Sequence, residues 1–466
     1  MAIAIVIVLL VVGSIIFHII SPWWFTPLAS NWQAIDDTIN LTLWVTGIVF
    51  ILVSFFLAFV IYRFRYDKNK CADYQPENKK LEFWLTTVTA IGVIAMLTPG
   101  LFVWGQFVTV PEGSDTVEVV GQQWHWSFRL PGVDRQLGRT AINSITQKNP
   151  FGIDSKDPYS LDDIVITSNE LHLPIDHPVK ILLRSKDVLH NFTVPQFRVK
   201  MDLVPGTTTY FWFTPNKIGR FEILCLELCG MGHYTMRGHV EVDTPESYKT
   251  WLIKQKTFQQ SLEEPLGDLV NGRELYRACI ACHGENAEGT ENIGAPRLAG
   301  LSHWYIKRQL GYFKKKVRGY NQQDSYGLQM SAIVNTLADD TAIKDVAAYI
   351  VSLAFQSSDD IHKPINSSLD NKSDTNSLNI TNGKRLYKQC SYCHGKQAEG
   401  EFAMNAPKLS NQDTGYLIRQ LNYFQQGLRG RHSKDLYGNQ MVLMSKLLHS
   451  KEDTRDVVAY IGTLPP

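Results

Sequence analysis

Two cysteines, a histidine and a methionine stand within one twelve-residue segment, Cys225-Leu-Glu-Leu-Cys229-Gly-Met-Gly-His233-Tyr-Thr-Met236. Thiolate and thioether sulfurs are soft ligands that select copper, imidazole also suits this metal, and a weakly bound methionine is the usual axial ligand in copper electron-transfer sites. Two cysteines exceed what one such copper uses, but both sulfurs together could bridge a pair of copper ions. The alternative, a disulfide between Cys225 and Cys229, would leave His233 and Met236 without a role.

A second imidazole for such a copper pair has to come from another part of the chain. His190 is the candidate, because it lies in an upstream β-rich stretch and copper proteins of the β-sandwich type collect their ligands from separate strands. From Thr116 to about Asp243, short β-branched and aromatic runs alternate with turn signals, which is typical of an all-β sandwich or barrel. We therefore predict a β domain at residues 111–250 that holds the copper ligands.

The segments 187–190, 199–206 and 225–236 resemble the copper A domain of cytochrome c oxidase subunit II. The resemblance implies a cupredoxin-like barrel with a binuclear copper centre. It also implies the ligand set, which consists of His190, Cys225, Cys229, His233, Met236 and the backbone carbonyl of Glu227. The Glu227 side chain would face the catalytic subunit, at a position where this family carries a magnesium ion.

Two further residues take expected roles from the same resemblance. Trp124, within Gln122-Gln-Trp-His-Trp126, matches the first tryptophan of the family's aromatic loop, which lies close to the copper where electrons arrive. The neighbouring His125 stands where the family often has tyrosine. Glu82, in Lys80-Leu-Glu-Phe-Trp84, resembles the carboxylate that opens a proton path into the catalytic subunit, although its spacing to the next tryptophan is one residue short. The alternatives are a core role for Trp124 and a purely dipole-stabilising role for Glu82.

Three apolar stretches near the N-terminus, roughly 2–20, 41–62 and 83–105, each approach the ~20 residues that span a bilayer as a helix. The loop between the second and third stretches is basic, and the positive-inside rule assigns it to the cytoplasm. The chain after residue 105 is then periplasmic. Residues 1–110 are predicted to anchor a multi-pass protein in a bacterial inner membrane.

The first apolar stretch lacks a positively charged n-region, so a cleaved signal peptide is the weaker interpretation. Members of the family commonly have a two-helix hairpin, and an additional N-terminal helix is a departure from that pattern. Trp23, Trp24 and Trp32 follow this stretch and are predicted to be interfacial anchors on the outer side.

Two C-x-x-C-H motifs follow the β region, Cys279-Ile-Ala-Cys282-His283 and Cys390-Ser-Tyr-Cys393-His394. This motif is the attachment signal for c-type haem. Two thiols three residues apart on one helical turn reach the two vinyl groups of a haem, and the adjacent histidine binds the iron. A single copy could belong to a zinc site, but two copies inside a repeat predict two covalently bound haems.

The two motifs lie in an internal repeat whose offset of 111 residues holds without a gap from Asn271 to Leu353. Apolar residues recur at helical spacing in each copy, so each copy is predicted to be a small all-α domain. The predicted domains are residues 266–356 and 380–466, and the polar segment 357–379 between them is a linker by composition.

The repeat also pairs Met330 with Met441, in Tyr326-Gly-Leu-Gln-Met330 and Tyr437-Gly-Asn-Gln-Met441. We predict these methionines as the sixth iron ligands, since a His/Met iron has the raised reduction potential of cytochromes c. The alternative is that they fill the core. The two units resemble the bacterial di-haem cytochromes c.

The chain has 466 residues and a net charge of +1, which gives no general attraction to nucleic acid. Six of the seven cysteines fall into three compact pairs, unlike a disulfide framework. The seventh, Cys71, belongs to the side predicted to be cytoplasmic, where a thiol stays reduced. Lys314-Lys-Lys316 and Arg318 form a basic stretch that is most simply a solvated face, and alternatively a docking site for an acidic partner.

Copper and two haems on the outer side of a membrane anchor can pass single electrons in series. The resemblance implies subunit II of a haem-copper cytochrome c oxidase with a fused di-haem cytochrome c. Its partners would be subunit I, subunit III and membrane lipid. Electrons would come from a periplasmic cytochrome or the cytochrome bc complex, pass through the haems to copper A and reach the oxygen-reducing, proton-translocating subunit I.

The shorter connecting segment, residues 255–268, precedes the first haem motif, so we expect the haem of Cys279 to lie nearer the copper. Two other functions share parts of this pattern. One is the copper A subunit of a nitric oxide reductase, and the other is a membrane-tethered electron carrier that acts without a catalytic partner.

Overall fold

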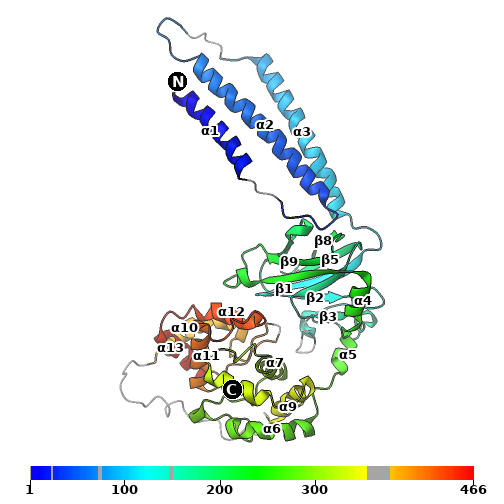
Figure 1. Cartoon of the computed structure of the whole chain (residues 1–466), viewed down its shortest axis with the longest axis vertical. Coiled ribbons are helices and arrows are strands. Elements are labelled where there is room, and N and C mark those ends of the chain that lie inside the picture. Colours follow the sequence, from blue (N-terminus) through cyan, green and yellow to red (C-terminus); the bar gives the residue numbers. More distant parts are fainter. Residues whose placement is uncertain are drawn as a thin grey trace.

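The computed structural model describes residues 2–21, 25–71, 76–145, 149, 151–353, 378–402 and 404–466. Trp23, Trp24 and most of the predicted linker at 357–379 lie outside the described residues. Along the long axis of the molecule, a bundle of three long helices is followed by a β domain and then by a helical region (Figure 1). These parts confirm the predicted multidomain fold, with an α-helical anchor, an all-β domain and all-α domains.

The anchor consists of α1 (Ala2–Ile20), α2 (Gln33–Arg63) and α3 (Lys79–Val108). Their most apolar windows have mean hydropathies of 3.1, 2.7 and 1.8, and all three helices are long and apolar enough to cross a membrane. Most of their apolar side chains are exposed, as expected for side chains whose natural solvent is lipid. The basic loop between α2 and α3 lies at the end of the bundle away from the β domain (Figure 1).

The start of α2 is attached to the β domain. Arg198 donates from Nε and Nη2 to the two carboxylate oxygens of Asp36, at 2.6 and 2.8 Å. Trp32 is only 2% exposed, and its indole N–H donates to the backbone oxygen of Trp212 at 3.0 Å. The prediction of Trp32 as an interfacial anchor is therefore wrong. It is a core residue, because Trp212 and Phe107 pack against its ring.

The β domain contains two five-stranded sheets, ordered β3-β2-β1-β5-β8 and β4-β10-β9-β6-β7. The strands are β1 (Asp115–Gln122), β2 (His125–Leu130), β3 (Ile164–Ile166), β4 (Glu170–Pro174), β5 (Val179–Ser185), β6 (His190–Val194), β7 (Val199–Leu203), β8 (Thr209–Phe213), β9 (Gly219–Cys225) and β10 (Arg237–Asp243). Alternate residues of β5 are buried, as the period of two requires. The apolar core between the sheets includes residues from nearly every strand.

Strand pairing sets the position of the predicted copper ligands. β6 begins at His190, β9 ends at Cys225, and these two strands pair antiparallel with Phe192 opposite Cys225. Residues 226–236 then form the loop to β10. The sheet thus brings the upstream histidine and the cysteine loop to the same end of the domain.

Short helices complete this half of the molecule. The α-helices α4 (Pro245–Ile253) and α5 (Phe258–Glu263) follow the last strand and lead into the helical region. The 3₁₀ turns are η1 (Ile142–Ser144), η2 (Pro158–Ser160), η3 (Pro195–Phe197), η4 (His233–Thr235) and, in the helical region, η5 (Glu291–Ile293).

The helical region is a tandem repeat of two four-helix units. The first has α6 (Leu269–His283), α7 (His303–Lys314), α8 (Ser325–Val334) and α9 (Asp340–Ser352). The second has α10 (Ile380–His394), α11 (Thr414–Gln426), α12 (Leu436–Ser445) and α13 (Lys451–Gly462). The first and last helices of each unit cross closely because a glycine lies at the crossing. A Cβ on Gly272 would lie 2.1 Å from the Asp345 carbonyl oxygen, and one on Gly383 would lie 2.0 Å from that of Asp456.

Candidate copper and haem sites

The loop after β9 gathers the soft ligands into one cluster. The sulfurs of Cys225 and Cys229 are 3.7 Å apart, and both thiols are free. The Cys229 sulfur lies 3.5 Å from Nδ1 of His233 and 3.9 Å from the sulfur of Met236. A ring nitrogen of His190 lies within 4.8 Å of both cysteine sulfurs. All five predicted side-chain ligands are thus together, and the disulfide alternative is not what the structure contains.

The surroundings of this cluster favour metal binding. Side-chain hydrogen bonds with Cys229 and with the His190 imidazole lower the pKa of Cys225 far below that of a free thiol. His190 is fully buried, and its Nε2 is hydrogen-bonded to the Asp187 carboxylate at 2.7 Å. Its Nδ1 makes no hydrogen bond within the described part of the chain. A buried ring nitrogen without a partner beside two sulfurs is the arrangement that a metal ion would satisfy.

Glu227 contributes to the cluster through its backbone. Its carbonyl oxygen accepts a hydrogen bond from the Cys225 thiol at 3.3 Å. The Glu227 side chain is half-buried on the same loop, between Leu226 and Leu228, which are 47% and 82% exposed. The carbonyl therefore lies with the sulfurs, as the resemblance implies, and the loop around it presents an apolar surface.

Trp124 lies directly on the cysteine loop. Its indole N–H donates to the Cys229 carbonyl at 3.1 Å, and the Gln123 side chain donates to the same oxygen at 2.6 Å. The ring packs so closely on the loop that a Cβ at Gly232 would lie 2.3 Å from it. Trp124 is 5% exposed, so it is a core residue, and its aromatic side chain also touches the cysteine loop.

The histidines of the two C-x-x-C-H motifs make equivalent hydrogen bonds. Nδ1 of His283 is hydrogen-bonded to the Pro296 carbonyl at 2.9 Å, and Nδ1 of His394 to the Pro407 carbonyl at 2.7 Å. Because a carbonyl only accepts, each Nδ1 carries the proton and each Nε2 has a free lone pair. Burial lowers the pKa of both histidines, which keeps the imidazoles neutral. A neutral imidazole oriented through its other nitrogen is the form that binds iron.

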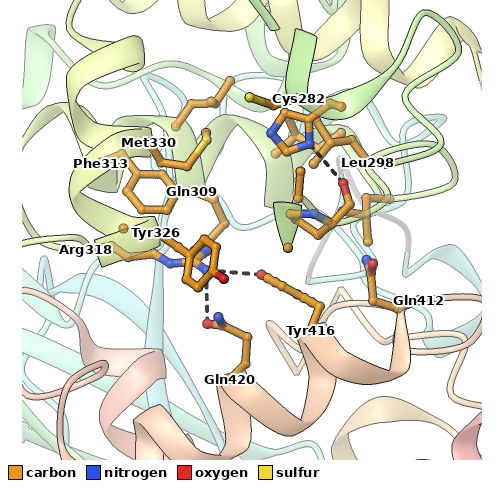
Figure 2. Close-up of a pocket in the computed structure, with 18 of the residues that line it drawn as sticks. Cys282, Leu298, Gln309, Phe313, Arg318, Tyr326, Met330, Gln412, Tyr416 and Gln420 are labelled. Carbon is orange, nitrogen blue, oxygen red and sulfur yellow. Dashed lines mark hydrogen bonds between the residues drawn. The ribbon is translucent and has the colours of Figure 1, made fainter. Parts of the chain in front are cut away.

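A cavity of about 430 Å³ lies in the first unit and opens toward the second. His283 and Met330 both line it, so the predicted proximal and sixth ligands meet in one space. Figure 2 shows Cys282 and Met330 on the first unit's side of the cavity and Gln412, Tyr416 and Gln420 on the second unit's side. Its apolar lining includes Leu298, Ile306, Leu310 and Phe313. An apolar space between a histidine and a methionine, with two cysteines on the adjoining helix, fits a c-type haem.

Comparisons with known proteins match both halves of the chain. Residues 115–242 match the family model described as cytochrome C oxidase subunit II, periplasmic domain, and residues 269–354 and 380–465 match the cytochrome c model. The alternative cytochrome c oxidase subunit 2 of Bradyrhizobium diazoefficiens is 55% identical over 258 residues, which are 55% of this chain and 93% of that protein. The chain belongs to the cytochrome c oxidase subunit II family.

Other proteins resemble parts of this subunit II family member. Cytochrome c oxidase subunit 2 of Cereibacter sphaeroides is 29% identical over 235 residues, covering 49% of this chain and 77% of that protein. The solved periplasmic domain of subunit II of cytochrome oxidase from Bradyrhizobium japonicum is 27% identical, with a TM-score of 0.23, and 31% of this chain covers 95% of it. Reduced cytochrome c4 from Pseudomonas stutzeri is 24% identical, with a TM-score of 0.32, and 43% of this chain covers all of it.

Membership in the subunit II family implies copper A in the β domain, haem c in the cytochrome c units and a subunit I partner. The residues present fit both cofactors. His190, Cys225, Cys229, His233, Met236 and the Glu227 carbonyl would hold the coppers. Cys279, Cys282, His283 and Met330 would hold one haem, and Cys390, Cys393, His394 and Met441 would hold the other.

Glu82 lies far from this chemistry. It stands in the first turn of α3, at the end of the anchor away from the β domain, and is exposed. The helix is capped by Asn78, whose side chain accepts from the backbone N–H of Leu81 at 3.1 Å. A carboxylate in the first turn also complements the helix dipole. Its predicted role in proton uptake thus stays a prediction.

Sequence reasoning missed a set of buried residues between the two cytochrome c units. Arg318 donates to Gln309 at 2.7 Å and across the interface to Gln420 at 3.1 Å. Arg429 donates to Gln420 at 2.6 Å and across the interface to Gln309 at 3.1 Å. Arg318 is 8% exposed, so its expected place on a solvated basic face is wrong. The signal was available, because both pairs keep the 111-residue offset.

The expected order of the two units relative to the copper site is also wrong. The second unit contacts the aromatic loop beside Cys229, where Gln440 on α12 donates to the Trp124 carbonyl at 3.1 Å. The length of a connecting segment limits how far a domain can reach, but the packing of the two units decides which of them meets the copper domain.

Proposed function

We propose that this chain is the electron-transfer subunit II of a haem-copper cytochrome c oxidase in a bacterial inner membrane. In the loaded protein, two covalent haems and a binuclear copper A centre carry single electrons from a periplasmic cytochrome or a cytochrome bc complex to subunit I, which reduces oxygen and moves protons. The observation that carries this proposal is the cluster of Cys225, Cys229, His190, His233 and Met236 in a chain with two C-x-x-C-H units.

The residues of the chain do distinct work in this function. Cys225 and Cys229 would supply two sulfur ligands to the copper centre, and Asp187 orients His190 through the 2.7 Å hydrogen bond. Pro296 and Pro407 hold the two proximal histidines by their carbonyls. Burial excludes water from these ligands, which limits the rearrangement that each electron transfer requires.

The position of the helices supports a periplasmic β domain. The basic loop between α2 and α3 lies opposite the β domain along the anchor, and basic loops remain in the cytoplasm. We propose that lipid, subunit I and subunit III surround the anchor, that Glu82 stands at the opening of a proton path, and that the Glu227 side chain takes part in a magnesium site at the subunit I interface. The exposed apolar side chains of Leu228 and Met231 beside Glu227 suit such an interface.

The test is metal analysis and copurification of the full chain from membranes in detergent. We expect two coppers and two irons per chain, together with a large haem-containing membrane subunit. One copper or none, with Cys225 and Cys229 oxidised to a disulfide, would reduce the protein to a membrane-bound cytochrome. Full metal content without any copurifying haem-containing subunit would favour an electron carrier without a catalytic partner.

A further inference from the structure

The second cytochrome c unit is packed on the aromatic loop of the copper domain. Tyr437, Gln440 and Met444 lie on one face of α12, since they are three and four residues apart. The Tyr437 ring lies 5.5 Å from the His125 ring, centre to centre, and Met444 packs on the core of the β domain. Figure 1 shows α12 on the side of the helical region that faces the sheets.

Trp124 links this contact to the copper cluster. Its carbonyl accepts from Gln440 at 3.1 Å, while its indole N–H donates to the Cys229 carbonyl, also at 3.1 Å. One residue therefore contacts the second cytochrome c unit with its backbone and the copper loop with its side chain. Trp124 is thus shared between the contact with the second unit and the core of the β domain.

An electrostatic link to the second unit lies beside His190. The Asp187 carboxylate, which holds His190, lies within electrostatic range of the Cys393 sulfur in the second haem motif. Lys186, which precedes Asp187 in the β domain, lies within electrostatic range of Glu401 in the second unit. The second unit therefore contacts the tryptophan side of the copper cluster and lies within electrostatic range of its histidine side.

The haem motif of the first unit lies away from the copper domain. Its motif helix α6 lies on the side of the helical region that faces away from the β domain (Figure 1). The two units meet through the buried arginine and glutamine pairs, and Arg308 of the first unit donates to the Asn405 carbonyl of the second at 3.1 Å. The second unit thus contacts both the copper domain and the first unit, while the motif helix α6 of the first unit lies on the far side.

We propose that the second cytochrome c domain is a permanently docked internal donor to the copper site, held by Gln440 on Trp124, and that external donors deliver electrons to the first domain. This inference rests on the proposed function. Each transfer moves one electron: the second domain is oxidised as the copper site is reduced, and the first domain then reduces the second. No bond forms or breaks, and no proton is needed. The docked domain also closes the Trp124 surface to soluble cytochromes.

The repeat offers a matched pair of variants for a distance measurement. Cys390→Ala/Cys393→Ala removes one attached haem, and Cys279→Ala/Cys282→Ala removes the other. The readout is the electron spin relaxation of the oxidised copper centre in the full chain, which a nearby ferric haem accelerates by a dipolar coupling that falls steeply with distance. We expect the acceleration to disappear in the first variant and to persist in the second. The opposite result, or the same acceleration in both, would overturn the proposal.

Removing a haem could unfold the second domain, so a single substitution that keeps both haems provides a second test. Gln440→Glu sets a carboxylate against the Trp124 carbonyl and keeps both haems, and Gln322→Glu, at an exposed position of the first unit, is the control. We expect the rate of copper reduction after flash photoreduction of the haems to fall about tenfold in Gln440→Glu, since a hydrogen bond at the contact is lost, and to stay within about twofold in the control. Equal rates in both variants would contradict docking through Gln440. Absence of the copper signal from the unmodified chain would instead refute the proposed function.

Discussion

Arg318 and Arg429 stand at equivalent positions of the two cytochrome c units, and each donates across the interface to the other unit's glutamine at 3.1 Å. The interface therefore has an approximate two-fold symmetry that the sequence repeat generates. Both guanidinium groups are at least nine-tenths buried, and their hydrogen-bond partners are the uncharged side chains of glutamine and tyrosine. Two buried positive charges thus lie between the haem sites.

Replacing either arginine should lower a haem reduction potential. Arg318 lines the cavity of the first unit, and a buried cation disfavours the more positive, oxidised iron. We expect Arg318→Gln to lower the potential of the first haem by on the order of 50 mV, and Arg429→Gln to do the same to the second. Spectroelectrochemical titration measures both. Arg277→Gln, at an arginine whose side chain is 71% exposed, is the control and should leave the potentials unchanged.

Because Asp187 orients His190, replacing Asp187 should weaken copper binding and leave haem attachment unchanged. Asp187→Asn replaces the carboxylate that accepts from His190 at 2.7 Å and from the Gln123 backbone N–H at 2.6 Å. We expect copper affinity to fall by about 10- to 100-fold, the usual cost of losing such a supporting hydrogen bond. Copper titration of the full chain tests this, with Asp134→Asn on the surface as control. Unchanged copper affinity at full haem content would show that Asp187 does not support the site.

The residues that could be predicted from the sequence are those whose chemistry is local. The spacing of Cys225, Cys229, His233 and Met236 within one loop indicated copper, and the structure brings these side chains together. His190 could be predicted because strands collect ligands from separate segments. The helical units followed from a gap-free repeat, and each helix of the first unit has a counterpart in the second.

The residues that could not be predicted depend on how whole domains pack. Trp32 looked like a membrane anchor from its position after an apolar stretch, but the fold carries it into the β domain beneath Trp212. Arg318 looked solvated because its neighbours are lysines, but a second copy of the fold covers it. The contact of Gln440 with Trp124 joins residues 316 positions apart, and no local pattern specifies it.

Because Trp124 packs closely on the cysteine loop, a side chain at Gly232 should disturb this loop. A side chain at Gly232 would collide with the Trp124 ring, because even its Cβ would lie 2.3 Å away. We expect Gly232→Val to displace the ring or the loop, with a cost of about 1–3 kcal/mol and weakened copper binding. Copper titration and thermal unfolding measure the two effects. Gly311→Ala in α7, where a Cβ meets nothing within 4 Å, should be neutral or stabilising. Normal copper binding in Gly232→Val would mean that the tight contact is not required.

His125 predicts how the stability of the chain depends on pH. Burial lowers the pKa of His125 to about 4, and the charges of Lys186 and Arg308 act in the same direction. The imidazole of the unfolded chain has a pKa near 6.5. Between pH 6.5 and pH 4, His125 therefore binds a proton in the unfolded state but not in the folded state. The contribution of neutral His125 is therefore fully present above pH 6.5 and is lost as the pH falls toward 4.

The contact of His125 with Tyr437 places this loss at the junction between the copper domain and the second cytochrome c unit. The difference between 6.5 and about 4 corresponds to about 3.5 kcal/mol at most, since each unit of pKa is worth about 1.4 kcal/mol. We expect the unfolding temperature of the full chain to fall between pH 7.5 and 5, and the fall to be smaller in His125→Phe. His449→Phe, at an exposed position, should behave like the unmodified chain. Phe keeps an aromatic ring at position 125 but has no nitrogen atom that can bind a proton. An equal fall of the unfolding temperature in both variants would therefore assign the pH dependence to other groups.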